Sequence, residues 1–278
     1  MIDRRRFAAG VLAAAFGAPA ARAGGDPFAL AGTFEQGGIA RGQLPSGATA
    51  LRFNDTAIPF AADRRFLIAF DRDAPPTATV EAVLGDGRIV RDPLVIAPRA
   101  WNISRLDRLA KYPVPSAEFE ARRPAELARI AAARARQTAA DGWRQPFAWP
   151  ATGRISTLFG SQRIYAGEPG AYHSGIDIAL PTGTPVRAPA DGVVILAAEA
   201  PFTLEGNLLM LDHGMGLSSA FLHLSRIDVR EGDAVRQGQA IGAVGATGRA
   251  TGPHLHWGLM WRGARIDPLL VAGAMPAR

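Results

Sequence analysis

The segment TGPHLHWGLMW near the C-terminus places His254 and His256 two residues apart. Because alternate residues of a β-strand point to the same face, both imidazoles would project together, with Cβ atoms about 7 Å apart. The chain has five histidines, and all lie in its C-terminal half: His173, His213, His223, His254 and His256. This clustering favours a metal site over isolated core histidines, and the spacing lets both rings border one ion without both binding it.

A second motif, HSGIDIA, supplies complementary ligands. Gly175 and the β-branched residues after it favour a loop that enters a strand, in which His173 and Asp177 share a face. Gly175 would leave room between these two side chains. Two histidines and one aspartate form a three-ligand set with an open fourth position, which is typical of catalytic zinc sites. The chain contains no HExxH motif, so the common helical metalloprotease design is excluded.

Several other residues near these motifs each have two possible roles. His213, in LDHGMG, lies at a turn signal and serves either local hydrogen bonding or catalysis. Arg163, Tyr165 and Tyr172 precede the first motif and either line a substrate groove or pack within a loop. Trp257 alternates with the two histidines of HLH and is expected to point away from them into the core.

The elements that position these motifs are predicted to be strands. Within residues 147–278, short apolar runs alternate with glycine-rich turns, a pattern typical of an all-β domain. Residues 24–108 contain similar runs between turn clusters, which predicts a small β-sandwich: ALRF, FLIAF, TATVEAVL and RIVRDPLVI. This accessory domain holds no histidine and no evident carboxylate pair, and we interpret it as a binding or spacer module.

Residues 109–146 are predicted to form a helical linker between the two β-regions. The pattern predicts a helix over residues 124–141, because Pro124 suits a first helical position and Gly142 can end the helix. Leu127, Ile130 and Ala131 would form a thin apolar stripe that lies on a neighbouring element.

Residues 1–23 have the features of an export signal. A basic start, MIDRRRF, precedes the short apolar run FAAGVLAAAFGA, and ARA then offers a small-residue cleavage site. The run is shorter than the roughly 20 residues that span a bilayer, so no transmembrane segment is expected in the mature chain. RRRF fits a twin-arginine signal as well as an ordinary one. We expect a periplasmic or secreted protein.

Charge and cysteine content exclude several classes of function. The chain has no cysteine, which excludes disulfides, thiolate zinc sites, cysteine nucleophiles and a lipidated N-terminal cysteine. Its formal net charge of +6 falls to +3 without residues 1–23, because these hold four arginines and one aspartate. With this modest charge and no basic-aromatic cluster, no nucleic-acid partner is expected.

Three motifs in order, HSGIDIA, AFLHLS and TGPHLHW, resemble those of the lysostaphin-type (LytM-like) zinc metallopeptidases, which cut peptide bonds in bacterial peptidoglycan. The resemblance covers about residues 147–270 and includes GRISTLFGSQR and VREGDAVRQGQAIGAVGATG. It implies a mainly β fold in which the C-terminal metallopeptidase domain is an open antiparallel β-barrel or sandwich. The N-terminal β-segment and the linking helix resemble those of exported Gram-negative members.

The resemblance also implies the role of each residue. One Zn²⁺ per chain would be bound by His173, Asp177 and His256, with His254 as the general base. His223, in AFLHLS, would orient the attacking water or stabilise the oxyanion. Members often carry an acidic residue soon after HLH, whereas this chain continues with the apolar WGLMW.

We therefore predict a zinc-dependent endopeptidase that hydrolyses peptide cross-links of peptidoglycan, with D,D-endopeptidase cleavage preferred and glycyl-glycine cleavage second. The substrates would be stem or cross-bridge peptides, and the N-terminal domain would offer a surface for a cell-wall or divisome protein. A catalytically inactive LytM-like activator of amidases is the alternative, although every expected ligand position is filled. A lipoyl- or biotin-carrier role is excluded because residues 147–278 contain no lysine to carry the cofactor.

Overall fold

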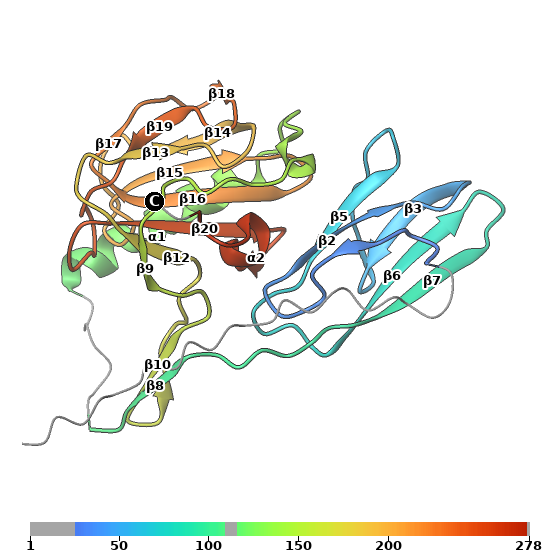
Figure 1. Cartoon of the computed structure of the whole chain (residues 1–278), viewed down its shortest axis with the longest axis horizontal. Helices are drawn as coiled ribbons and strands as arrows, with labels where there is room; N and C mark the ends of the chain where they lie inside the picture. Colours follow the sequence, from blue (N-terminus) through green and yellow to red (C-terminus); the bar gives the residue numbers. More distant parts are fainter. Residues whose placement is uncertain (1–25, 109–115, 277–278) are drawn as a thin grey trace, which may run out of the picture.

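The computed structural model describes residues 26–108 and 116–276. The predicted export signal, residues 1–23, lies outside the described residues. The described chain is mainly β, as predicted, with two β-regions separated in sequence by a helix (Figure 1). Among these residues, no helix has the length and apolar character needed to cross a membrane.

Two antiparallel sheets form the N-terminal β-region. One contains β1 (Ala31–Gly32), β2 (Ile39–Gln43) and β5 (Arg65–Ala69); the other contains β4 (Thr56–Ala57), β3 (Ala48–Phe53), β6 (Thr77–Leu84) and β7 (Ile89–Val95). Burial alternates along β6, as expected of a strand that is covered on one face. Side chains from both sheets, such as Phe66 and Val80, are fully buried in one core. This arrangement agrees with the predicted β-sandwich.

The next strand, β8 (Ile103–Leu106), leaves this sandwich. It pairs in parallel with β10 (Gln162–Tyr165), which pairs in turn with β11 (Glu168–Pro169). The turn and strand signals of residues 24–108 carry no information about this distant partner. A strand from the N-terminal part of the chain therefore lies beside the segment that leads into the HSGIDIA motif.

The C-terminal β-region is built on one eight-stranded antiparallel sheet. Its order is β18 (Ala234–Val235), β14 (Gly192–Ala197), β15 (Asn207–Asp212), β16 (Leu217–Leu224), β20 (His254–Trp261), β12 (Ile176–Ala179) and β9 (Arg154–Thr157), with β21 (Ala264–Ile266) paired to β20. A smaller sheet contains β13 (Pro185–Arg187), β19 (Ala240–Ala243) and β17 (Arg226–Ile227). The strands β12, β20 and β16 are neighbours at the centre of the large sheet, and they carry the predicted motifs.

The linking helix differs from the prediction at both ends. It is α1 (Ala117–Ala135), which begins seven residues before Pro124 and ends six residues before the predicted end at residue 141. Ser116 caps the helix by accepting a hydrogen bond from the backbone N–H of Phe119 at 3.1 Å, and this cap fixes the start. Pro124 lies inside the helix with its ring exposed. The proline signal was therefore wrong as a marker of the first turn.

The predicted apolar stripe of α1 is also wrong in part. Ile130 is buried, as expected, but Leu127 is 49% exposed and its place on the buried face is taken by Glu126 and Ala133. Ile130 and Ala133 pack in a small cluster with Ile195 and other side chains of the C-terminal sheet. The helix is rotated about its axis relative to the prediction, because Thr203 of the C-terminal region donates hydrogen bonds to Glu126 and holds this side chain inward.

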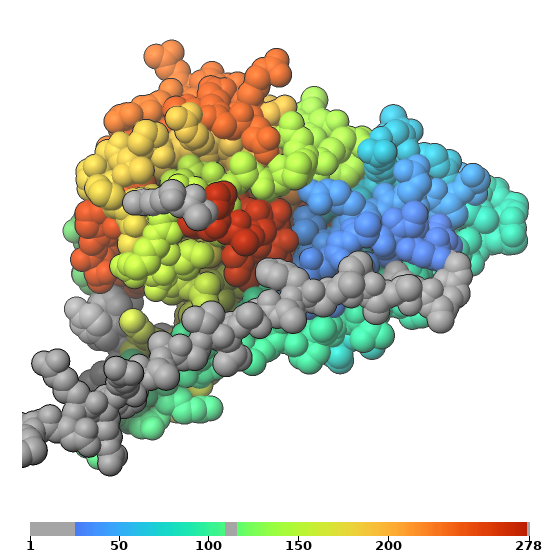
Figure 2. Space-filling model, viewed as in Figure 1, coloured from blue at the N-terminus to red at the C-terminus, as the bar shows by residue number. Residues whose placement is uncertain are grey.

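The N-terminal sandwich packs directly against the C-terminal region. Figure 2 shows the blue surface of residues near 40 in contact with the red surface of α2 (Pro268–Ala272) and its flanks. Asp267, which caps α2, donates its N–H to the carbonyl of Gly37 at 2.9 Å and pairs with Arg99 at 2.9 Å. Arg41 donates to the carbonyl of Trp143 in the short helix η1 (Gly142–Arg144) at 2.7 Å.

Candidate metal centre

Three neighbouring strands carry most of the predicted site residues. In the register of β12 and β20, Asp177 lies opposite His256, and Ala179 lies opposite His254. Side chains that face each other across an antiparallel pair have Cβ atoms about 5 Å apart, within reach of a shared ligand. On the other side of β20, Leu222 of β16 pairs with His256, and His223 follows it. The register therefore brings the HLH, HSGIDIA and AFLHLS motifs to one place.

His173 reaches this place from the loop before β12, and Gly175 makes the approach feasible. A Cβ atom at Gly175 would lie 2.4 Å from the carbonyl oxygen of Trp257 and 2.7 Å from Nε2 of His256. Any side chain at position 175 would collide with the backbone of β20. The glycine thus lets the loop cross closely over the HLH strand; the space it leaves is taken by Trp257 and His256 of β20, not by the side chains of His173 and Asp177 as predicted.

His173, Asp177 and His256 converge on one point. Nε2 of His173 lies 2.9 Å from Oδ1 of Asp177 and 3.0 Å from Nδ1 of His256, and the latter two atoms are 2.9 Å apart. A zinc ion with bonds of about 2.0–2.1 Å holds tetrahedral ligands about 3.3 Å apart. The three atoms therefore need to spread only slightly to hold such an ion, and they form the one such group among the described residues.

The donor set fits a cation for a chemical reason. Nδ1 of His173 contacts the carbonyl of Leu158 at 3.2 Å, so we assign the proton to Nδ1 and a lone pair to Nε2. That lone pair faces the carboxylate of Asp177. Two lone pairs at this distance repel each other unless a proton or a cation lies between them. Imidazole nitrogens with one carboxylate oxygen are ligands that Zn²⁺ accepts.

The electrostatics keep the ligands in their metal-binding forms. Burial alone would raise the pKa of Asp177, but the imidazole nitrogens of His173 and His256 beside its Oδ1 outweigh burial and hold the pKa well below its usual range. Burial also lowers the pKa of His256, which favours the neutral imidazole. A carboxylate and a neutral imidazole are the forms that bind metal.

His254 borders the cluster without joining the triangle. Its Nδ1 donates to the carbonyl of Gly252 at 2.8 Å, so Nε2 carries a lone pair. That Nε2 is 3.9 Å from Oδ1 of Asp177, about 1 Å farther than Nδ1 of His256 is from the same oxygen. The two histidines of HLH thus face the same side, as their spacing predicts, and differ in their distance from the carboxylate.

His223 completes a group of four histidines. Its ring centroid is 4.7 Å from that of His254, and its Nδ1 donates to the carbonyl of Thr247 at 2.8 Å. The backbone of His223 has φ of 64°, a left-handed conformation that is uncommon for a residue with a side chain. Burial lowers the pKa of His223 to about 4, so its imidazole is neutral at pH 7.

The fifth histidine, His213, lies outside this group. It is fully buried, and its Nδ1 donates to the carbonyl of Asp191 at 2.8 Å while its Nε2 accepts from Ser219 at 2.7 Å. Its contacts are therefore the local hydrogen bonds that its turn signal suggested. Trp257 is also fully buried, and its indole packs against Trp149 at 5.7 Å.

Sequence reasoning missed the groups that orient the imidazoles. These are the backbone carbonyls of Leu158, Gly252 and Thr247, which fix the Nδ1 protons of His173, His254 and His223 respectively. A carbonyl group is present at every residue, so no side-chain pattern could have marked these three.

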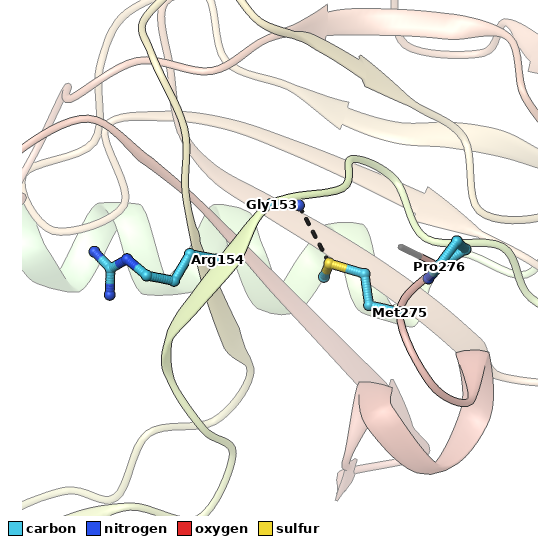
Figure 3. A pocket seen from close by; sticks show the side chains of 4 residues that line it. All are labelled: Gly153, Arg154, Met275 and Pro276. Atoms are coloured by element: carbon cyan, nitrogen blue, oxygen red, sulfur yellow. Dashed lines mark hydrogen bonds between the residues drawn. The ribbon is translucent and has the colours of Figure 1, made fainter. Parts of the chain in front are cut away.

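An open pocket elsewhere on the C-terminal region contains none of these residues. It is lined by Gly153, Arg154, Met275 and Pro276, and the N–H of Gly153 points to the sulfur of Met275 at 3.2 Å (Figure 3). It has no group of titratable side chains, so we assign no chemistry to it.

Known proteins resemble this chain in the region of the cluster. The profile of Peptidase family M23 matches residues 171–268. The peptidoglycan DD-endopeptidase ShyA of Vibrio cholerae is 42% identical over 117 residues, covering 42% of this chain and 27% of ShyA. The DD-carboxypeptidase/endopeptidase Mpg of Neisseria meningitidis is 42% identical over 123 residues, covering 44% of this chain and 28% of Mpg. The chain thus spans about a quarter of the length of these relatives.

A solved structure resembles nearly the whole chain. The crystal structure of a putative peptidase M23 from Pseudomonas aeruginosa has a TM-score of 0.66 and 30% sequence identity, covering 87% of this chain and 96% of the other. The likeness includes the N-terminal sandwich, because a match of that extent cannot be confined to the C-terminal region.

Proposed function

The chain belongs to peptidase family M23, and from this premise we propose that it is a zinc-dependent endopeptidase that hydrolyses peptide cross-links of bacterial peptidoglycan. The observation that carries the proposal is the triangle of His173, Asp177 and His256, whose ligand atoms lie 2.9–3.0 Å apart. Zn²⁺, when bound, polarises a carbonyl and lowers the pKa of water from about 16 towards 7, which supplies the Lewis acid and the nucleophile of peptide hydrolysis.

His254 is the proposed general base. Its Nδ1 proton is held by the carbonyl of Gly252, which leaves the Nε2 lone pair free to accept a proton at the edge of the ligand triangle. An imidazole in this state takes a proton from the nucleophile and returns it to the leaving amine. The separation of 3.9 Å from Asp177 supports a role in proton transfer rather than in metal binding.

His223 is proposed to orient the attacking water. The notable features are its buried, neutral ring and its Nδ1–H bond to Thr247, which together leave only a lone pair at Nε2. A lone pair accepts a hydrogen bond from water, whereas an oxyanion needs a donor. Of the two roles that the family resemblance implies, these features favour orientation of the water over stabilisation of the oxyanion.

The proposed bond is a D,D cross-link between stem peptides. This choice is supported by two relatives, the peptidoglycan DD-endopeptidase ShyA and the DD-carboxypeptidase/endopeptidase Mpg. A glycyl-glycine bridge is the second candidate. A catalytically inactive activator of amidases is disfavoured because all five proposed metal and catalytic positions hold the required residue types. Location in the periplasm or outside the cell follows from the export signal expected over residues 1–23.

Digestion of purified sacculi tests the proposal. The protein is incubated with sacculi with and without a zinc chelator, and the released fragments are identified by mass spectrometry. We expect about one zinc per chain and metal-dependent conversion of cross-linked muropeptides to monomers at the D,D bond. Cleavage by the metal-free protein would contradict the zinc mechanism, and intact sacculi with zinc-loaded protein would contradict the endopeptidase activity.

A further inference from the structure

The proposed metal ligand His173 lies at the end of a loop whose strands, β10 and β11, belong to a separate small sheet with β8 and not to the large sheet. We call residues 158–173, between β9 and β12, the ligand loop. Within it, Gly160 N–H donates to the carbonyl of His173 and His173 N–H donates to the carbonyl of Ser161, both at 2.8 Å. The position of His173 therefore depends on the backbone of Gly160 and Ser161, and on whatever fixes that backbone in turn.

A buried arginine of the N-terminal sandwich binds this backbone. Arg72 is 7% exposed, and its Nε and Nη2 donate to the carbonyl of Gly160 at 3.3 and 3.1 Å. Nη2 also donates to Oε1 of Gln162 at 3.1 Å, and the amide of Gln162 donates to the carbonyl of Gly170 at 2.8 Å. One guanidinium thus ties together both ends of the ligand loop.

The same guanidinium makes cation–π contacts with two aromatic rings. Its Cζ atom is 4.7 Å from the ring centroid of Tyr172, the residue before His173, and 5.1 Å from that of Trp101. Burial and the nearby Asp71 raise the pKa of Tyr172 to about 12, so its phenol stays protonated at neutral pH. Tyr172 thus packs against Arg72 and, with ring centroids 6.2 Å apart, against Phe159 of the same loop.

Trp101 also packs against the ligand loop, at Gly160 and Phe159. Gly160 has φ of 77°, and a Cβ atom there would lie 2.2 Å from Cε3 of Trp101. The indole therefore lies directly on the backbone of the ligand loop, and its edge packs on Phe159 at 5.8 Å. Two residues beyond Trp101, β8 begins its parallel pairing with β10 of the same loop.

We propose that Arg72 is a positioning residue for the metal centre: through Gly160 and Gln162, the N-terminal sandwich sets the geometry of the ligand loop, and thereby the place of His173 in the ligand triangle. This inference rests on the proposed zinc function. The sandwich is then more than a spacer, since it contributes the outer support of one metal ligand without touching substrate. An arginine suits the position because its planar fork binds two acceptors while its faces stack on rings.

The alternative is that Arg72 contributes only to the stability of the interface, and a matched arginine separates the two roles. Arg41, also in the N-terminal sandwich, donates to the carbonyls of Trp143 and Gln145 at 2.7 and 3.3 Å. It bridges the same two regions through the same kind of contact. Its acceptors lie in η1 and the residue after it, not in the ligand loop.

The test compares Arg72→Met with Arg41→Met in the full chain. Methionine keeps an unbranched apolar stem beside the rings and removes every donor. Zinc affinity is measured by competition with a chromophoric chelator, beside the melting temperature of each metal-free protein. We expect both variants to melt at lower temperature, but only Arg72→Met to bind zinc about tenfold or more weakly, as for loss of a group that supports a metal ligand. Arg41→Met should bind zinc within about twofold of the unchanged chain.

Arg72→Lys keeps the proposal testable if methionine prevents folding. Lysine retains the charge and the stem but cannot bind both acceptors in the plane of a fork, so zinc affinity should fall between the two values. Unchanged zinc affinity in a folded Arg72 variant, or an equal loss in Arg41→Met, would overturn the positioning role while leaving the proposed peptidase intact. A failure of the unchanged chain to bind zinc would instead overturn the proposed function, and this inference with it.

Discussion

The two histidines of HLH should fail in different ways when each is replaced by alanine. His256 contributes an atom 2.9 Å from Asp177 and 3.0 Å from His173, so His256→Ala leaves two of three protein ligands. We expect zinc affinity to fall by orders of magnitude and activity to fall with it. His254→Ala leaves the triangle complete, because its Nε2 is 3.9 Å from the carboxylate, and zinc should stay near one per chain.

The size of the His254 effect follows from its role. Loss of a general base typically slows the chemical step by about 10²–10⁴, which is about 3–5 kcal/mol in the activation barrier. The zinc content by mass spectrometry and the single-turnover rate on a soluble cross-linked peptide are measured for the same preparation. Both variants should fold, since neither imidazole belongs to the apolar core; circular dichroism checks this.

The outcome can refute the assignment in two ways. If His254→Ala loses zinc while His256→Ala keeps it, the proposed roles of the two residues are reversed. If both variants keep zinc and full rate, the metal lies elsewhere, and the triangle of His173, Asp177 and His256 has another purpose.

Two further predictions concern the residues around the site. Burial lowers the pKa of His213 to about 4, whereas a histidine in the unfolded chain has a pKa of about 6.5. Between these pH values the unfolded chain binds a proton that the folded chain does not, so the free energy of unfolding falls by about 3 kcal/mol as the pH drops from 6.5 towards 4. Urea unfolding across that range should be less pH-dependent in His213→Gln, and an unchanged slope would contradict the buried neutral state. Gly175→Ala places a Cβ 2.4 Å from the carbonyl of Trp257 and should displace the ligand loop, whereas Gly85→Ala meets no atom closer than 3.7 Å. Zinc titration should show weaker zinc binding by Gly175→Ala than by Gly85→Ala. Equal zinc affinities would argue against the close approach of residue 175 to β20.

The sequence predicted the parts of the site that depend on local geometry. Side chains two residues apart on a β-strand point to the same face, so HLH alone placed His254 and His256 on one face. A glycine at position 175 was visible in HSGIDIA, but its reason was not, because the atoms that a Cβ would meet there belong to Trp257 and His256 of β20. The mainly β character of both regions was also predictable from the spacing of turn residues, because turn signals are local in the sequence.

Two local signals compete at the start of the linking helix, and the cap at Ser116 outweighs Pro124. Pro124 is compatible with a first turn, but Ser116 offers the backbone an actual acceptor, and a cap of this kind stabilises a helix by about 1 kcal/mol. The buried side of α1 was set by partners elsewhere in the chain. Both oxygens of Glu126 bind Thr203, 77 residues away, and so hold this side chain inward in place of Leu127.

Strand patterns alone did not separate His213 from His223, and the family resemblance was needed to give His223 a role in the site. His213 follows β15 and His223 lies near the end of β16, yet His213 is fully buried beside Ser219 while His223 lies beside His254 and His256. Strand register and the left-handed backbone at His223 decide this difference.

The support of His173 was likewise invisible in the sequence. Arg72 and Gly160 are 88 residues apart and belong to different β-regions. No sequence motif around either residue predicts their contact. The sequence by itself determined which side chains could bind a metal, because ligand chemistry and strand periodicity are local. Only the tertiary structure decided which of them meet and what holds them, because those contacts form when distant segments pack together.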